Sequence, residues 1–159
     1  MHIQACVQPI VCAFFCEVAH VIGSIERTSA LIISTEGNCP DTTWLDEKLR
    51  EFIKIYRTYQ PKTPIILMPF NLCGDSEFFE DRKKDRLDRR KVQQDIVKDF
   101  NSMGDENVHF LLRFDNYQKE FEGNSIWHEI CVDGLHSTDV AYLWSAQEIY
   151  KFLKEKNIF

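Results

Sequence analysis

An aspartate and a histidine lie three residues apart near the end of the chain, at Asp133 and His136, with a glycine after the aspartate. This spacing allows the carboxylate to accept a hydrogen bond from one imidazole nitrogen, which leaves the other nitrogen available as a general base. A short Asp-x-x-His motif also arises by chance, and an aspartate before a helix often serves only as a cap. The pair is a candidate catalytic acid–base pair, and the case for a catalytic role depends on the rest of the chain.

A helix is predicted to follow this pair directly. Thr138 or Asp139 is expected to cap it, and its apolar residues recur every three or four positions. The residues expected to form its buried face are Val140, Leu143, Ala146, Tyr150 and Leu153. The histidine would then lie on a short loop held by a helix, which is a common location for catalytic groups.

Length and charge exclude several classes of protein. A chain of 159 residues fits one domain with one core. Its net charge of −6 argues against general binding of nucleic acid, which needs a basic surface. No apolar run approaches the roughly 20 residues of a membrane span, and the start of the chain lacks the basic leader of a signal peptide. The six cysteines form no Cys-x-x-Cys pair and are expected to be buried thiols.

Three short apolar runs predict buried parallel strands, at residues 30–34, 64–69 and 108–112. The helix between the first two runs is expected to begin at a Thr43 cap. Its buried stripe is expected to contain Leu45, Leu49, Phe52, Tyr56 and Tyr59. Strand, helix and strand in this order predict a right-handed βαβ unit.

The start of the chain predicts two further elements. Alternation over residues 2–8 is consistent with a short strand. Helical spacing then runs from Val11 through Phe14, Val18, Ile22 and Ile25, and predicts a largely buried helix to about Arg27.

Gly37 and Asn38 follow the first predicted strand. Ligands of open α/β sheets bind at the carboxyl ends of the strands, where these residues are expected to lie. The glycine permits close approach to the backbone, and the asparagine amide is suited to donate a hydrogen bond to a developing oxyanion. Gly-Asn is also ordinary turn chemistry.

The middle of the chain carries a dense charged run and then an aromatic segment. From Glu80 to Lys91 every residue except Leu87 is charged, which predicts a solvated helix face with ion pairs. The following loop contains Phe114, Tyr117, Phe121 and Trp127, which either line a substrate cleft or pack the loop onto the core. His109 within the third strand is expected to be structural. His128, Cys131 and His136 make only a weak zinc pattern, and no metal is expected.

Taken together, these segments resemble the SGNH (GDSL-like) hydrolases, especially their acyl and carbohydrate esterase branch. The similarity lies in the strand followed by Gly37-Asn38, in the strand led by Pro61-Lys62-Thr63-Pro64, and in the block Val132 to Asp139. It extends from about residue 20 to the end of the chain. The family often has proline at the position of Ser137.

The resemblance implies a three-layer α/β/α sandwich with a parallel sheet. It also implies hydrolysis of an ester, often an acetyl ester on a sugar, without metal or cofactor. Carried onto this chain, His136 is the general base, Asp133 orients it, and Asn38 with Gly37 serves the oxyanion.

The chain departs from the family in its first part. The family's Gly-Asp-Ser block, which carries the nucleophile, lies near the N-terminus after the first strand, and here none precedes Asn38. Gly74-Asp75-Ser76 lies after the Asn block, so Ser76 is a weak candidate nucleophile and Cys39 a more remote one.

About two strands of the family fold are therefore expected to be missing. The single domain is expected to be incomplete at its N-terminus, and its catalytic machinery is expected to be incomplete because the usual serine nucleophile is not found. Three readings follow: a fragment of an esterase, a non-catalytic relative that binds a sugar or acyl ligand or a partner protein, or an enzyme with a relocated nucleophile. The edge of the strand at 31–34 is expected to promote self-association unless residues 2–8 cover it.

Overall fold

The computed structural model describes residues 15–70, 75–113, 130–133 and 136–158. These residues belong to two compact units. The first comprises Met1–Phe70 with Asp88–Phe110, and the second comprises Asn71–Leu87 with Leu111–Phe159. In the described part of the chain the first unit contains the parallel sheet, and the second contains the Asp133–His136 pair.

The sheet consists of β1 (Leu31–Ile33), β2 (Ile65–Leu67) and β3 (Val108–Phe110), in the order β1-β2-β3 with both pairs parallel. The three predicted strands are therefore confirmed, although each is shorter than its apolar run. β1 lies at one end of this order. Because residues 2–8 lie outside the described residues, the expected self-association through that edge stays a prediction.

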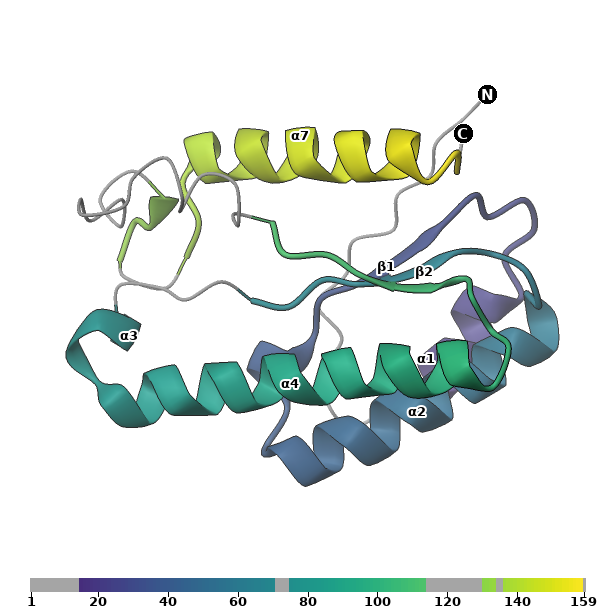
Figure 1. Ribbon diagram of the computed structural model, residues 1–159, viewed down its shortest axis with the longest axis horizontal. Helices are drawn as coiled ribbons and strands as arrows, with labels where there is room; N and C mark the ends of the chain where they lie inside the picture. The colour runs from purple at the N-terminus through teal and green to yellow at the C-terminus, as the bar shows by residue number, and fades with distance from the viewer. Residues whose placement is uncertain (1–14, 71–74, 114–129, 134–135, 159) are drawn as a thin grey trace. The chain divides into compact units, whose positions relative to one another are not determined.

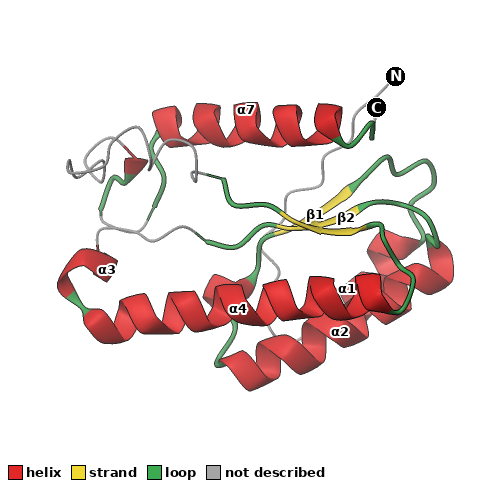
Figure 2. Ribbon diagram, viewed as in Figure 1, coloured by secondary structure: helices red, strands yellow, loops and turns green. Residues whose placement is uncertain are grey.

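Three helices of the first unit pack on one face of this sheet: α1 (Phe15–Gly23), α2 (Thr42–Tyr59) and the part of α4 (Glu80–Ser102) from Asp88 onward (Figures 1 and 2). Their apolar side chains form one core with alternate strand residues such as Leu31, Ile65 and Val108. The α2 stripe predicted from spacing is confirmed at Leu45, Leu49, Phe52 and Tyr56, whereas Tyr59 is exposed.

The first helix ends earlier than its apolar spacing predicts. α1 stops at Gly23 rather than near Arg27, which has a left-handed φ of 61°. The side-chain amide Nε2 of Gln60 donates to the carbonyl oxygens of Gly23 and Ile25, each at 3.0 Å. These two bonds satisfy carbonyls that have no partner within the helix, so the chain can leave the helix here. Residues 11 and 14 of the predicted helix lie outside the described residues.

The cap of α2 also differs from the prediction. Asp41 is the N-cap, and its carboxylate accepts a hydrogen bond from the backbone N of Trp44 at 2.7 Å. Thr43, the predicted cap, lies inside the first turn. The carboxylate therefore takes a helix N–H that would otherwise have no partner, close to the positive end of the helix dipole.

Replacing Asp41 by alanine should lower the free energy of unfolding by about 1 kcal/mol, because the Trp44 N–H loses its acceptor. Thr43→Ala is the matched control and should cost clearly less. Urea unfolding followed by circular dichroism measures both. A larger loss for Thr43→Ala than for Asp41→Ala would contradict this assignment of the cap.

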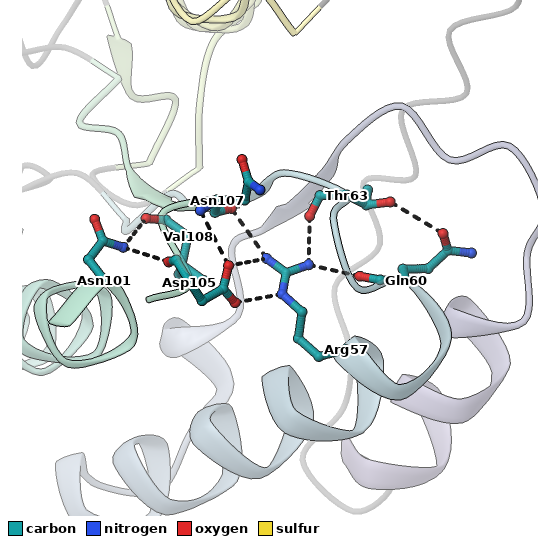
Figure 3. A network of polar contacts seen from close by, with 7 residues as sticks. All are labelled: Arg57, Gln60, Thr63, Asn101, Asp105, Asn107 and Val108. Atoms are coloured by element: carbon teal, nitrogen blue, oxygen red, sulfur yellow. Dashed lines mark hydrogen bonds and ion pairs between the residues drawn. The ribbon is translucent and has the colours of Figure 1, made fainter. Parts of the chain in front are cut away.

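A polar network joins the C-terminal end of α2 to the segments that lead into β2 and β3 (Figure 3). The guanidinium of Arg57 pairs with Asp105 through Nε–Oδ2 at 2.6 Å and Nη2–Oδ1 at 3.2 Å. Its Nη1 also donates to the carbonyl oxygens of Gln60 at 3.0 Å and Thr63 at 2.7 Å. One side chain thus fastens three separate segments at the end of the sheet where the strands begin.

Asn101 extends this network from α4. Its side-chain amide donates to the carbonyl oxygens of Asp105 at 3.1 Å and Val108 at 2.9 Å (Figure 3). The turn between α4 and β3 is therefore held from both sides, which fixes where β3 enters the sheet.

In the second unit, α7 (Asp139–Glu155) begins at a Thr138 cap, whose Oγ1 accepts from the backbone N of Ala141 at 3.2 Å. The prediction of its buried face is wrong except at Leu153. The buried residues are Ala141, Ser145 and Leu153, while Val140, Leu143, Ala146 and Tyr150 are exposed. Ser145 can be buried because its hydroxyl donates to the Ala141 carbonyl at 2.7 Å.

Candidate active site

The side chains of Asp133 and His136 form a hydrogen-bonded pair in the second unit. Asp133 Oδ2 lies 2.6 Å from His136 Nδ1, and Asp133 Oδ1 accepts from the backbone N of His136 at 2.7 Å. Both carboxylate oxygens therefore bind the same residue. With the carboxylate ionised, Nδ1 carries the proton and Nε2 is left with a lone pair, which is the tautomer that a general base requires.

Asp133 and His136 lie between two short segments that pair in antiparallel fashion. Cys131 and Ser137 form an isolated β-bridge. The backbone N of Val132 donates to the carbonyl oxygen of His136 at 2.8 Å, and that of Thr138 donates to Ile130 at 3.0 Å. Ile130 is buried and Thr138 caps α7, so both segments are anchored.

The pair itself is open to solvent. The side chain of His136 is 72% exposed and that of Asp133 is 55% exposed. Electrostatic interactions of so exposed a pair are strongly screened by water. The carboxylate therefore acts mainly through geometry, by fixing the orientation and the tautomer of the imidazole.

In the first unit, Gly37 and Asn38 lie in η2 (Glu36–Asn38), directly after β1, as predicted. The turn is closed by hydrogen bonds from the backbone N of Asn38 to Thr35 O at 3.0 Å and from that of Cys39 to Glu36 O at 3.2 Å. Gly37 and Asn38 are both exposed. They therefore lie accessible at the carboxyl end of a parallel strand, where ligands of α/β sheets bind.

The structure gives no packing reason for the glycine. A Cβ atom built on Gly37 would lie 3.5 Å from the nearest ring atom of Phe70, which is an ordinary contact. Its φ also lies outside the left-handed range that favours glycine. The surrounding protein would thus accept a small side chain here.

The charged run is solvated, as predicted, over most of its length, but not at Arg89. This side chain is 8% exposed and donates hydrogen bonds to backbone carbonyls of the turn after β1. The burial of Arg89 was not predicted from the sequence, because all charged residues of the run were expected to face solvent. Arg89 shares the spacing of the buried residues Gln93, Ile96 and Phe100 on the same helix, and that spacing is the signal that identifies it.

The two candidate nucleophiles lie in different units. Ser76 lies in the second unit, in the four-residue helix α3 (Asp75–Phe78), and is 3% exposed. Cys39 lies in the first unit, is buried, and its thiol lies 3.5 Å from the carbonyl oxygen of Thr35. Neither role is tested by this geometry, so the nucleophile stays a prediction.

Several other predicted features fall outside the described residues. These are the aromatic segment around Phe114 to Trp127, and His128 of the weak zinc pattern. Among the residues that the structure does describe, no group of three or more histidine, cysteine or acidic side chains could hold a metal ion. No helix in the same part of the chain is long and apolar enough to cross a membrane.

Two solved structures resemble the chain closely in fold. One is a protein described as a GDSL-like lipase from Bacteroides ovatus ATCC 8483, with a TM-score of 0.72 and 20% identity over 87% of this chain. The other is a salicylyl-acyltransferase from a tetracycline biosynthetic pathway, with a TM-score of 0.71 and 16% identity over 91% of this chain. The matches span 39% and 42% of those proteins, so this chain corresponds to about two fifths of their length. This similarity confirms the predicted α/β sandwich fold with a parallel sheet.

The family comparison agrees with the structural one. No curated protein matches the chain. The family described as the GDSL-like Lipase/Acylhydrolase family matches residues 12–154, which is most of the sequence. The chain belongs to the GDSL-like lipase/acylhydrolase family.

Proposed function

We propose that this chain carries the acid–base and oxyanion groups of a serine-type carboxylic ester hydrolase. The observation that carries the proposal is the Asp133–His136 pair, in which the carboxylate binds both the ring Nδ1 and the backbone N of the same histidine. His136 is the general base, Asp133 orients it, and Gly37 with Asn38 donates to the oxyanion. The membership of the family supports the same class of reaction.

The proposed reaction proceeds in two steps. In the first, His136 Nε2 takes the proton of a serine hydroxyl while the serine oxygen attacks the ester carbonyl carbon. The oxyanion then collapses, the C–O bond to the alcohol breaks, and the imidazolium returns its proton to the leaving alcohol. In the second step, water attacks the acyl-serine in the same manner and releases the carboxylic acid. Ser76 is the serine to be tested first.

The substrate is a small-molecule or carbohydrate ester, with an acetyl ester on a sugar as the narrower proposal taken from the family resemblance. Hydrolysis of p-nitrophenyl acetate and of acetylated sugars, measured on the same preparation, tests it. Release of acetate at a rate above the buffer blank supports the proposal, and a folded chain that releases none from either substrate contradicts it.

A second function, ligand binding without catalysis, is favoured by one observation. Ser76, the candidate nucleophile, is 3% exposed, which is unsuited to attack on a bound ester. In that case acetylated sugars should shift backbone amide resonances near Asp133 and His136 without being hydrolysed. Turnover of the same ligands would exclude this alternative.

Asp133→Asn is expected to lower kcat/KM for p-nitrophenyl acetate by about 10²- to 10⁴-fold, because an amide in this position no longer selects the base tautomer of the imidazole. Asp139→Asn is the matched control, since Asp139 lies nearby in the first turn of α7 and does not belong to the pair. It should change kcat/KM by less than about threefold. Equal effects of the two substitutions would remove Asp133 from the mechanism.

A further inference from the structure

We infer that Arg89 is a positioning residue for the Gly37–Asn38 turn, holding the peptide that presents the N–H of Gly37. The inference rests on the proposed function, because the turn matters to catalysis only if it serves the oxyanion. It concerns the first unit alone, where Arg89 and the turn both lie.

The contacts of Arg89 bracket the turn on both sides. Its Nη1 donates to the carbonyl oxygen of Glu36 at 2.6 Å and to that of Cys39 at 2.9 Å. Its Nη2 lies 3.4 Å from the carbonyl oxygen of Pro40. Gly37 and Asn38 stand between these anchor points, so a single guanidinium spans the ends of the segment that carries them.

The bond to Glu36 fixes the direction of the next N–H group. In a planar trans peptide the C=O of one residue and the N–H of the next point in opposite directions, and the described residues contain no cis peptide bond. Because the Glu36 carbonyl points at Arg89, the N–H of Gly37 points away from Arg89. Gly37 is an exposed residue, and its N–H group lies on the side of the peptide opposite the buried guanidinium.

The same turn is fastened to the end of β2. The carboxylate of Glu36, a buried side chain, accepts a hydrogen bond from the backbone N of Phe70. Arg90 donates to the carbonyl oxygen of Phe70 through Nη2 at 3.2 Å. Two successive arginines of α4 therefore bind the segments that follow the adjacent strands β1 and β2. These hydrogen bonds limit the movement of the turn after β1.

The burial of Arg89 indicates a strong geometric constraint. Removing a guanidinium from water is costly unless its N–H groups find acceptors, and here backbone carbonyls supply them. Arg89 reaches three carbonyls through two terminal nitrogens, Nη1 and Nη2, whereas lysine has only one terminal nitrogen. Lysine at this position should therefore hold the turn only in part.

The test compares Arg89→Met and Arg89→Lys with Lys91→Met as the matched control. Lys91 lies on the same helix and forms an exposed ion pair with Asp95 at 2.8 Å. In Arg89→Met we expect kcat for p-nitrophenyl acetate to fall about 10- to 100-fold, with KM changed by less than threefold, and Arg89→Lys to lie between. The Gly37 amide resonance should shift in Arg89→Met. Lys91→Met should match the wild type in every measurement.

The amide spectrum separates failure of this inference from failure of the proposed function. If the wild type hydrolyses no ester, the proposed function fails, and the Gly37 resonance alone decides whether Arg89 orients the turn. If the wild type is active and a folded Arg89→Met protein keeps its kcat, the inference is overturned. An unchanged Gly37 amide in that variant also overturns it. Should Arg89→Met fail to fold, Arg89→Lys supplies the same comparison.

Discussion

His136→Ala should abolish ester hydrolysis by this chain, lowering kcat/KM by roughly three orders of magnitude or more. In the proposed mechanism the imidazole accepts the proton of the nucleophile and returns it to the leaving alcohol. Its Nδ1 is already engaged by Asp133 at 2.6 Å, so no other atom of this pair can take over the role of Nε2. Initial rates with p-nitrophenyl acetate over a range of substrate concentrations measure the loss.

His20→Ala is the control for this experiment. His20 is also exposed and also hydrogen-bonded, through Nδ1 to the hydroxyl of Tyr59 at 2.9 Å, but it lies on α1 in the first unit. It should keep kcat/KM within about threefold of the wild type. If the two histidine variants lose activity to the same extent while both remain folded, the assignment of His136 as the general base is wrong.

Arg57→Met should lower the free energy of unfolding by about 2–4 kcal/mol. The side chains of Arg57 and Asp105 are only 14% and 21% exposed, so solvent replaces the lost bonds poorly. The substitution leaves the Asp105 carboxylate and the carbonyl oxygens of Gln60 and Thr63 without this donor (Figure 3).

Lys91→Met again supplies the comparison, because it removes an exposed ion pair within one helix. Such pairs contribute less than about 1 kcal/mol. Urea unfolding followed by circular dichroism gives both values under the same conditions. A loss for Arg57→Met no greater than that for Lys91→Met would show that the network in Figure 3 does not stabilise the fold.

The sheet was largely predictable from sequence because its strands are short apolar runs in a parallel arrangement. Runs such as Leu31–Ile33 and Ile65–Leu67 are recognisable without any knowledge of the partner strand. The helix α2 was predictable for a similar reason, since its apolar residues repeat with a single period. The cap was not, because Asp41 and Thr43 are both favourable cap residues and local sequence does not rank them.

The buried face of α7 shows where the periodic argument fails. Val140, Leu143 and Tyr150 are spaced correctly for a buried stripe, yet the structure buries Ala141 and Ser145 instead. Small side chains allow a helix to pack closely against its neighbours. A serine whose hydroxyl donates a hydrogen bond to a carbonyl of its own helix can be buried at little cost in free energy. A pattern that counts only large apolar residues as buried cannot detect either effect.

The candidate site was predictable where the chemistry is local in sequence. Asp133 and His136 are three residues apart, so their contact depends on a short connection alone. Arg89 and the turn at Glu36 to Pro40 are about 50 residues apart, and only the packing of α4 brings them together. The proposed nucleophile would be a residue distant from His136 in the chain, so sequence spacing does not identify it.

The most direct test of the proposed active site is labelling with a fluorophosphonate probe, followed by mapping of the modified peptide by mass spectrometry. Wild type and His136→Ala are labelled side by side, with His20→Ala as the folded control. We predict that one serine is labelled in the wild type and in His20→Ala, and that this label is lost in His136→Ala. A folded wild-type chain that takes no label, or a label that persists without His136, would contradict the assignment of a serine–histidine mechanism to this chain.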